Sequence, residues 1–404
     1  MIDFPASPTV GQQFTAAGVT WVWDGVKWAA SGLSVAFLPL AGGNMSGPIV
    51  LAADPAANLQ AATKQYVDGG RLGDNRLING DMRVDQRNGG AAGTAINTYT
   101  VDRWQYLASQ ATKFTWGRSA STVSGFPYYL NAQSSSAYAL LTGDYFVFEQ
   151  PIEADMVSDF AWGTASAQPV TLSFWAGSSL TGTFGGVVRG GSGSGRSYPF
   201  TFQITTANSW QKFAITIPGD TAGTWVLSGN GAGVSLFFDL GSGATNRAPA
   251  NAWTTGLYVG ANGAVNVVST NGASLGITGV KLEIGSVATP FNRQSLAKTL
   301  ADCQRYYYQG VPPLKGLVSG TLPSTALSRL SCRHPVTMRA APTITMPFAI
   351  AAYDGVNPYG LTTVGANESS VDVLEFEATA SAPFSNRAVT VYQGTGLLQL
   401  SAEL

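Results

Sequence analysis

Residues 170–176 read VTLSFWA, a run in which small and large apolar residues recur at every second position. A repeat of two is the pattern of an antiparallel β-strand that buries one face. Comparable short runs stand between Gly, Asn and Ser residues at 99–107, 138–141, 198–204, 210–217, 234–240 and 277–284. Regular short strands with turn residues between them predict a β-sandwich over residues 76–293, in the form of a jelly roll.

The segments before the sandwich predict a small β-module and a neck. Residues 21–28 read WVWDGVKW, two alternating runs around an Asp-Gly turn, which is a β-hairpin pattern; we expect this module to span residues 1–33. Residues 34–75 are irregular except for one short helical pattern at 61–68. A helix this short is not stable alone, so we expect it to pack against symmetry mates.

The segments after the sandwich predict a linking helix and a last domain. The helix is expected at 294–310, and four residues would share one of its faces: Leu296, Leu300, Cys303 and Tyr307. Residues 311–404 would form a C-terminal β tip domain of ordinary size, with strands at 327–333, 343–346, 371–377 and 388–392. The predicted fold class is therefore mainly β.

The composition narrows the class of protein. Of 404 residues, 45% are hydrophobic, only 11% are charged and 48 are glycine. Average globular proteins have roughly 25% charged residues, so the surface must be mostly uncharged, which suits a fibre or shell protein. Lys and Arg number 22 against 23 Asp and Glu, which gives no electrostatic reason to expect nucleic acid as a partner. Near-zero net charge favours a subunit held in an oligomer.

The sequence also bears on compartment. It opens without the basic and apolar regions of a secretory signal, and no apolar run approaches the ~20 residues of a membrane span. Two cysteines are too few for a disulfide framework. We therefore expect assembly in a reducing cytoplasm, without membrane insertion.

Acidic residues are the candidates for a catalytic role. Cleavage of a glycan needs two carboxylates about 5 to 9.5 Å apart. One local cluster offers them, formed by Glu149, Glu153, Asp155 and Asp159. Acidic residues at a strand end more commonly solvate a rim, so we expect no catalytic residue in this chain.

Metal and cofactor sites are not expected either. Glu283 lies in an apolar run and would be buried against Arg103 or another cation, with a calcium ligand as the alternative. Cys303, Cys332 and His334 lack a fourth donor for a zinc site, which favours buried free thiols. Glycine-rich residues 190–195 do not connect a strand to a helix as a dinucleotide site would, so they predict a loop.

Aromatic residues are the remaining candidates for a binding role. Sugar rings stack on aromatic faces while polar side chains bond the hydroxyls at the edges. The candidates in the sandwich are Trp116, Tyr128, Tyr129, Trp162, Trp225 and Trp253. Most sandwich aromatics fill cores or interfaces, which is the competing interpretation for each. Trp21, Trp23 and Trp28 would supply the core of the N-terminal module or dock onto another protein, with a sugar platform as the alternative.

Residues 79–87 read NGDMRVDQR, and residues 99–104 read YTVDRW. With GVKLEIG at 279–285, ATPF at 288–291 and CQRYYY at 303–308, this order resembles a domain of phage and prophage tail-fibre proteins. Residues 61–68, which follow MSGP at 45–48, are similar to the neck repeat of phage fibres, and the Trp-rich opening is similar to an N-terminal virion module. Together these segments span about three quarters of the chain.

The resemblance implies a homotrimeric tail fibre in the virion, with a middle domain similar to carbohydrate-binding jelly rolls. Trp21, Trp23 and Trp28 would then dock to tail, baseplate or neck proteins, and the distal domains would meet host cell-surface polysaccharide. Three copies raise weak sugar contacts to useful avidity, so a strong site motif is not required. Two alternatives stay open: a structural collar, whisker or head-fibre protein, and a capsule depolymerase, for which the expected β-helical repeat is missing from the sequence.

Overall fold

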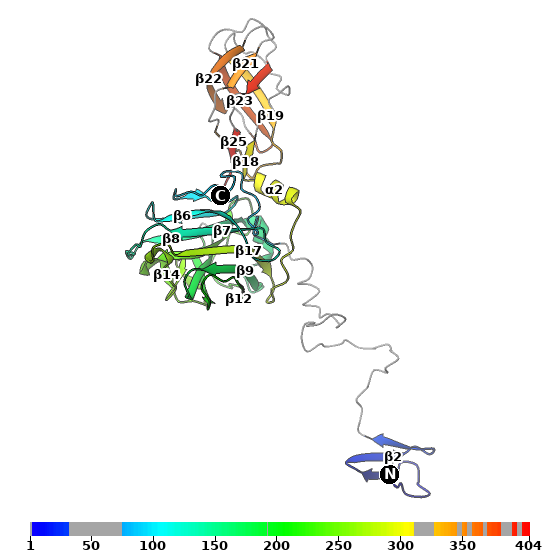
Figure 1. Ribbon diagram of the computed structural model, residues 1–404. Helices are drawn as coiled ribbons and strands as arrows, with labels where there is room; N and C mark the ends of the chain where they lie inside the picture. The colour runs from blue at the N-terminus through cyan, green and yellow to red at the C-terminus, as the bar shows by residue number, and fades with distance from the viewer. Residues whose placement is uncertain are drawn as a thin grey trace. The chain divides into compact units, whose positions relative to one another are not determined.

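The computed structural model describes residues 2–31, 75–191, 193–310, 327–345, 350–353, 358–366, 370–380, 390–393 and 398–404 (Figure 1). The chain divides into two compact units, residues 1–66 and 67–404. We describe each unit by itself. The predicted neck helix at 61–68, and all of the predicted neck at 34–75 except Asn75, lie outside the described residues.

The first unit contains the predicted hairpin. Strands β1 (Gln13–Ala16), β2 (Val19–Trp23) and β3 (Trp28–Ser31) form one antiparallel sheet. The β2–β3 turn is closed by Asp24, whose carboxylate accepts the backbone N–H groups of Val26 and Lys27 at 2.8 Å each. The side chains of Trp21, Trp23 and Trp28 are partly buried. Phe4 stacks on Trp28 at 5.4 Å and meets Trp21 edge-on, so these two indoles form the module's small core; docking stays a prediction.

The second unit contains a sandwich of two antiparallel sheets, which confirms the predicted mainly β, jelly-roll-like fold. In spatial order, the first sheet consists of β12 (Gln211–Ile217), β9 (Val170–Ser178), β17 (Ser274–Ile284), β7 (Tyr128–Ser134) and β6 (Phe114–Ala120). The second consists of β15 (Thr254–Thr255), β11 (Arg196–Ile204), β10 (Gly182–Gly190), β13 (Ala232–Ser242), β8 (Tyr145–Glu153), β5 (Gln105–Ala108) and β4 (Thr98–Tyr99).

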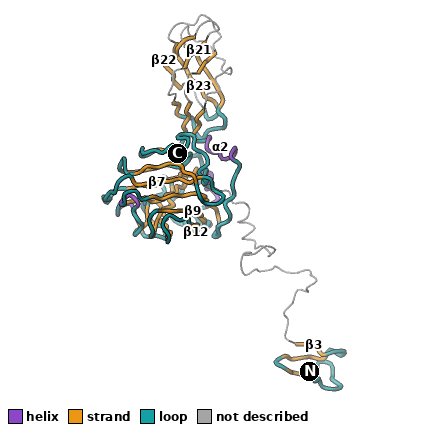
Figure 2. Tube along the Cα trace, in the orientation of Figure 1, coloured by secondary structure: helices purple, strands orange, loops and turns teal. Residues whose placement is uncertain are grey.

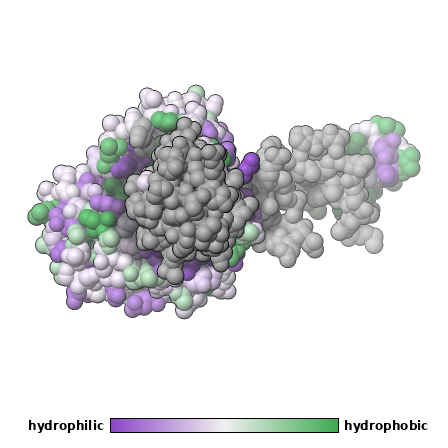
Figure 3. Space-filling model, turned by 90° about the horizontal axis from the view of Figure 1, so that it is seen from above, coloured by the Kyte–Doolittle hydropathy of each residue, from purple (hydrophilic) through white to green (hydrophobic). Residues whose placement is uncertain are grey.

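Side chains from both sheets fill the space between them. The alternation seen in the sequence sends Val170, Leu172 and Phe174 of β9 inward, and Phe174 meets Phe238 of β13 edge-on at 5.0 Å. Trp104 lies fully buried beside them. Most of the visible surface of the sandwich is white or pale in Figure 3, which marks residues of intermediate hydropathy. This agrees with the small share of charged residues.

Shorter elements connect these strands. Three are 3-10 turns, η1 (Ala154–Phe160), η2 (Ala244–Asn246) and η3 (Val267–Ser269). Two short strands, β14 (Arg247–Ala248) and β16 (Gly260–Ala261), pair in parallel. Helices make up little of the described chain (Figure 2). None of the described helices is long and apolar enough to cross a membrane.

Several local predictions were wrong. The predicted strand at 99–107 is two short strands, β4 and β5, which pair antiparallel because residues 100–104 turn between them. Residues 138–141 form no strand, because the Asp144 carboxylate binds the Tyr138 hydroxyl and the Leu141 N–H, at 2.8 and 2.9 Å, and turns the chain. Strands β6, β7 and β10 were not predicted, and in β10 the glycines hide the strand pattern. The linking helix α2 spans only Leu296–Gln304, and Leu296 on its predicted apolar face is 55% exposed.

Helix α2 ends early because the following residues pair as a strand. Strand β18 (Tyr307–Gly310) hydrogen-bonds to β25 (Leu398–Ser401), which also pairs with β20 (Thr343–Thr345). The other C-terminal sheet has the order β19 (Leu327–Arg333), β23 (Val373–Ala380), β22 (Pro358–Ala366), β21 (Ile350–Tyr353) and β24 (Thr390–Gln393). The predicted C-terminal strands at 327–333, 343–346, 371–377 and 388–392 coincide with β19, β20, β23 and β24 to within a few residues.

The segment at 79–87 is a structural junction. The Asn79 amide donates to the carbonyls of Val84 and Asp102, at 2.8 and 3.0 Å. The Asp102 carboxylate accepts the N–H of Gln86 at 2.6 Å, and the Gln86 side chain reaches the Tyr307 carbonyl at 2.8 Å. Asn79 and Arg103 both have left-handed backbones, with φ of 58° and 71°. This motif therefore ties the start of the sandwich to β18.

Candidate functional site

Two of the predicted glycan-stacking residues are buried. Trp116 is 3% exposed and Trp162 is 1% exposed, and both belong to the sandwich core. The Trp116 indole N–H donates to the Ala95 carbonyl at 2.8 Å, which fixes the ring inside. Neither indole presents a face to solvent, because each fills space that the sandwich would otherwise leave empty. Neither residue is therefore available to stack on a glycan.

Trp225 and Trp253 gather around Trp162. Their ring centroids lie 4.7 and 5.0 Å from that of Trp162, and 5.4 Å from one another. Their indole N–H groups donate to the carbonyls of Ala222 and Pro218, at 3.1 and 2.7 Å. Both rings are partly buried and pack against the core, so this tryptophan cluster closes one end of the sandwich.

Tyr128 and Tyr129 are neighbours on β7 but face opposite ways. Tyr128 packs against the core, with the Arg118 guanidinium 4.3 Å from its ring centroid. Tyr129 lies on the outer face of the five-stranded sheet, because successive side chains of a strand alternate between faces. Its ring meets that of Trp210 at 4.9 Å, close to perpendicular. Of the six predicted residues, Tyr129 is the one that stands on an open sheet face.

Five aromatic residues share this outer face, and we call them the aromatic stripe: Trp210, Tyr129, Trp175, Phe126 and Phe291. Each is partly exposed, and none belongs to the hydrophobic core clusters of the described residues. Trp175 occupies the outward position of β9 between the core residues Phe174 and Ala176. Phe126 meets Phe291 edge-on at 5.1 Å. These large rings are therefore held at the surface and not used to fill the sandwich.

Glycines, which have no side chain, leave the space on the sheet surface that the rings occupy. Gly177 of β9 and Gly276 of β17 are paired in register, and the Trp210 indole crosses both. A Cβ on Gly276 would lie 2.7 Å from the Tyr129 ring and 3.0 Å from that of Trp210. Gly279, with φ of +61°, similarly leaves room for Phe126 and Trp175. The stripe thus has two aromatic groups along β17, Tyr129 with Trp210 at Gly276 and Phe126 with Trp175 at Gly279, and the strand is irregular between them.

A stripe of this kind suits an elongated ligand with alternating apolar and polar surfaces. Aromatic faces accept apolar C–H surface, and the polar groups around them fix orientation. Asn131, Gln133 and Lys212 lie on the same outer face at the edges of the stripe, and Gln133 and Lys212 are exposed. The arrangement can hold a sugar chain across the sheet without any covalent chemistry.

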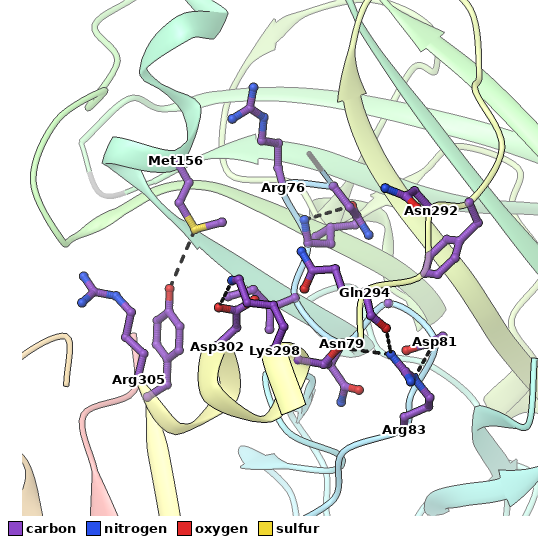
Figure 4. Close-up of a pocket in the computed structure, with 17 residues that line it drawn as sticks. Arg76, Asn79, Asp81, Arg83, Met156, Asn292, Gln294, Lys298, Asp302 and Arg305 are labelled. Carbon is purple, nitrogen blue, oxygen red and sulfur yellow. Dashed lines mark hydrogen bonds and ion pairs between the residues drawn. The ribbon is translucent and has the colours of Figure 1, made fainter. Parts of the chain in front are cut away.

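A pocket of about 440 Å³ lies at the Phe291 end of the stripe (Figure 4). Its walls come from the entry segment 75–83, the connection at 291–294, helix α2 and Met156. Charged residues line much of it, and each is ion-paired: Arg76 with Asp159 at 2.6 Å, Arg83 with Asp81 at 2.6 Å, Arg305 with Glu153 at 2.9 Å, and Lys298 with Asp302.

Three of the four acidic candidates have separate hydrogen-bond or ion-pair partners, and the fourth is buried. The Glu153 carboxylate is held by both nitrogens of a bidentate Arg305 fork, at 3.0 and 2.9 Å. Asp159 pairs with Arg76, and Asp155 accepts the N–H of Gly229 at 2.5 Å. Glu149 lies buried on β8, where burial raises the pKa of its carboxyl. Each carboxylate thus has its own structural environment.

Glu283 is buried, as expected, but Arg103 is not its partner. The Lys281 ammonium lies 2.9 Å from the Glu283 carboxylate, and Thr289 donates to it from both its N–H and its hydroxyl. Arg103 is instead paired with Glu403. Among the described residues, no group of three or more His, Cys, Asp or Glu side chains could hold a metal ion. Cys303 is a buried free thiol.

The single histidine of the chain offers a pH test of the C-terminal strands. Burial lowers the pKa of His334 below its usual 6.5, although its Nδ1 lies 3.0 Å from the Val371 carbonyl. The folded chain therefore prefers the neutral ring, and stability should fall as pH drops below about 6.5 toward the folded pKa. NMR titration of the one imidazole resonance measures that pKa directly. His334→Gln should remove this part of the pH dependence; a folded pKa at or above 6.5 would contradict the assignment.

Comparisons with known proteins do not identify a family. No family model matches the chain, and no curated protein matches it. A tailspike protein 4 domain of bacteriophage CBA120 is 14% identical at a TM-score of 0.29, over 52% of this chain and 21% of that one. A putative sugar binding protein from Bacteroides thetaiotaomicron is 10% identical at a TM-score of 0.31, over 52% of this chain and 100% of that one.

A family 11 carbohydrate-binding module of a Clostridium thermocellum cellulase is 12% identical at a TM-score of 0.27, over 50% of this chain and 99% of that one. The chain thus spans about a fifth of the length of the tailspike structure, and nearly all of the module. Similarities this loose carry no functional argument, since function depends on the residues of a site and not on a shared fold.

Proposed function

We propose that this chain is a fibre protein of a tailed-bacteriophage particle whose sandwich binds host cell-surface polysaccharide along the aromatic stripe. The observation that carries the proposal is the stripe itself: five partly exposed rings that lie outside the core on one sheet face. Large contiguous apolar patches on a protein surface often mark interaction sites. The N-terminal tryptophan module would attach the fibre to tail, baseplate or neck proteins.

The proposed binding is adhesive and multivalent. A shallow stripe on a flat sheet gives weak single-site affinity, because only one side of a sugar chain is covered. In a homotrimer, three copies would act together and raise the avidity by several orders of magnitude without new contacts. Assembly would take place in the host cytoplasm, and the finished protein would reside in the virion. We propose no catalytic step, because Glu153 and Asp159 are engaged by arginines.

The proposed function can be tested by comparing how the parent protein and two matched tryptophan variants bind extracted host polysaccharide. Trp175→Ala is expected to weaken binding roughly tenfold per site, since an aromatic anchor at a binding surface commonly contributes on the order of 1 to 2 kcal/mol. The matched control is Trp225→Ala, which removes an equally large, partly buried ring from the tryptophan cluster. Surface plasmon resonance on immobilised polysaccharide, with the full chain, measures both.

The two variants separate the competing sites. If Trp225→Ala abolishes binding and Trp175→Ala does not, the tryptophan cluster is the glycan site and the stripe is not. If the parent protein binds neither cells nor polysaccharide, the adhesive function is wrong and the structural collar alternative is favoured. Release of reducing ends from the polysaccharide would instead indicate a depolymerase.

A further inference from the structure

The pocket and the aromatic stripe are continuous. Phe291 is both the last ring of the stripe and a wall of the pocket. Two residues further on, Arg293 lies over the Phe126 ring at 5.4 Å, while its Nε is 2.9 Å from the Asp81 carboxylate at the pocket wall. A chain that follows the stripe past Phe126 therefore meets the mouth of the pocket.

The size of the pocket fits one or two sugar residues and not a long chain. Its volume of about 440 Å³ is near the lower end of the range for small-molecule sites. The fully buried Tyr306 forms part of its wall. Because this volume has no room for a long chain, a glycan that enters from the stripe would end here, and the pocket would bind a chain terminus.

The charge balance of the pocket favours a single negative charge on that terminal residue. In the described residues, four cations line the pocket, namely Arg76, Arg83, Lys298 and Arg305, and Arg293 pairs with the lining residue Asp81 from outside. These five cations are ion-paired with four carboxylates: Asp81, Asp159, Asp302 and Glu153. Asp81 is shared by Arg83 and Arg293, so one positive charge is in excess. A monoanion would neutralise it, whereas a dianion such as a phosphate monoester would leave the site negative.

The positions of the cations agree with this balance. The Lys298 side chain is 59% exposed, so it can turn toward a ligand, whereas the guanidinium of the 39% exposed Arg305 is held by Glu153. The buried Nε of Arg76 has no hydrogen-bond partner among the described residues. In Figure 4, Asn292 and Gln294 lie on the opposite side of the view from Arg305; their amides could bond sugar hydroxyls. The charged side chains would bind the negative group of the terminal sugar residue, and the amides would bond the hydroxyls at its uncharged edges.

We propose that the pocket beside helix α2 binds a terminal hexuronic acid residue of the glycan whose chain lies on the aromatic stripe. The proposal rests on the proposed function and adds the substrate class and the end that is recognised. It implies that the protein prefers acidic polysaccharide and engages chain ends as well as chain interiors.

Calorimetric titration with three probes tests the pocket: a hexuronate oligosaccharide, the same oligosaccharide with reduced carboxyl groups, and the free hexuronic acid. The parent protein should prefer the acidic oligosaccharide about five- to tenfold, because a charge-assisted contact is being gained at a partly exposed site. Arg76→Gln and Lys298→Gln should each erase most of that preference, and added salt should weaken it. The matched control is Lys113→Gln, a partly exposed cation that does not line the pocket.

The outcomes separate the pocket from the stripe. Equal affinity for acidic and reduced oligosaccharides, with Trp175→Ala weakening both, would overturn the pocket and leave the proposed function standing. Binding of the free hexuronic acid that depends on Arg76 would support the pocket, whereas binding of the acidic oligosaccharide that Trp175→Ala leaves unchanged would count against the stripe. If no probe binds the parent protein, the pocket proposal fails together with an acidic-glycan role for the stripe.

Discussion

Glu403→Ala is expected to lower the free energy of unfolding of residues 67–404 by about 3 to 5 kcal/mol, the usual cost of leaving a buried charge without its partner. The Arg103 side chain is 1% exposed and ion-paired with Glu403. Its guanidinium also donates to the Pro151 carbonyl at 2.7 Å and lies 3.5 Å from the Tyr306 ring centroid. Without Glu403, this cation would stay buried with no carboxylate, and Arg87 would lose its partner at 2.8 Å. Denaturant unfolding followed by tryptophan fluorescence measures the loss.

An exposed ion pair provides the control. Lys298 and Asp302 pair one helical turn apart on α2, with 59% and 25% of their side chains exposed. Asp302→Ala should cost no more than about 0.5 kcal/mol, because such pairs are screened by water and salt. The loss in unfolding free energy for Glu403→Gln should lie between the losses for Glu403→Ala and Asp302→Ala, because the amide keeps a hydrogen-bonding oxygen but carries no charge. If Glu403→Ala and Asp302→Ala cost the same, the contact of Glu403 with Arg103 does not hold the last strand in place.

Strand positions were largely predictable from the sequence, and their failures have local causes. Where an inward face is apolar at every second residue, as in β9 and β17, the pattern alone locates the strand. It fails in β10, whose glycines contribute no side chain to the pattern. It also fails at 305–310, where helical spacing continues but pairing with β25 imposes a strand. Such pairing joins residues about ninety apart, which no local pattern encodes.

The candidate site was predictable only in part. Tyr129 was predicted, and the same alternation that places Phe174 inward would have placed Trp175 outward, so that signal was present in the sequence. Trp210 could not be found this way, because it lies just before β12 and rests on a glycine pair formed by β9 and β17. Trp116 and Trp162, two of the six candidates, are buried. The face on which a ring lies, more than its type, separates a binding candidate from a core residue.

The double variant Trp175→Ala with Trp210→Ala is expected to weaken glycan binding at least about a hundredfold per site, from roughly tenfold for each ring. Its unfolding midpoint should change little, because both rings lie outside the core clusters of the described residues. Glycan binding by surface plasmon resonance and unfolding by calorimetry are measured on the same preparation.

Trp162→Ala should give the opposite result. This ring is 1% exposed and contacts Phe160, Trp225 and Trp253, so its truncation should cost about 3 to 5 kcal/mol through lost contacts and a cavity. Below its unfolding temperature, the variant should still bind glycan with unchanged affinity per site. The reason is that Trp162 lies in the core, whereas the stripe lies on the outer face of the five-stranded sheet. Early unfolding of the double variant would instead show that the stripe is a packing layer. Loss of a ligand-binding ring should lower glycan affinity and leave the unfolding temperature unchanged. Loss of a core ring should lower the unfolding temperature and leave glycan affinity unchanged.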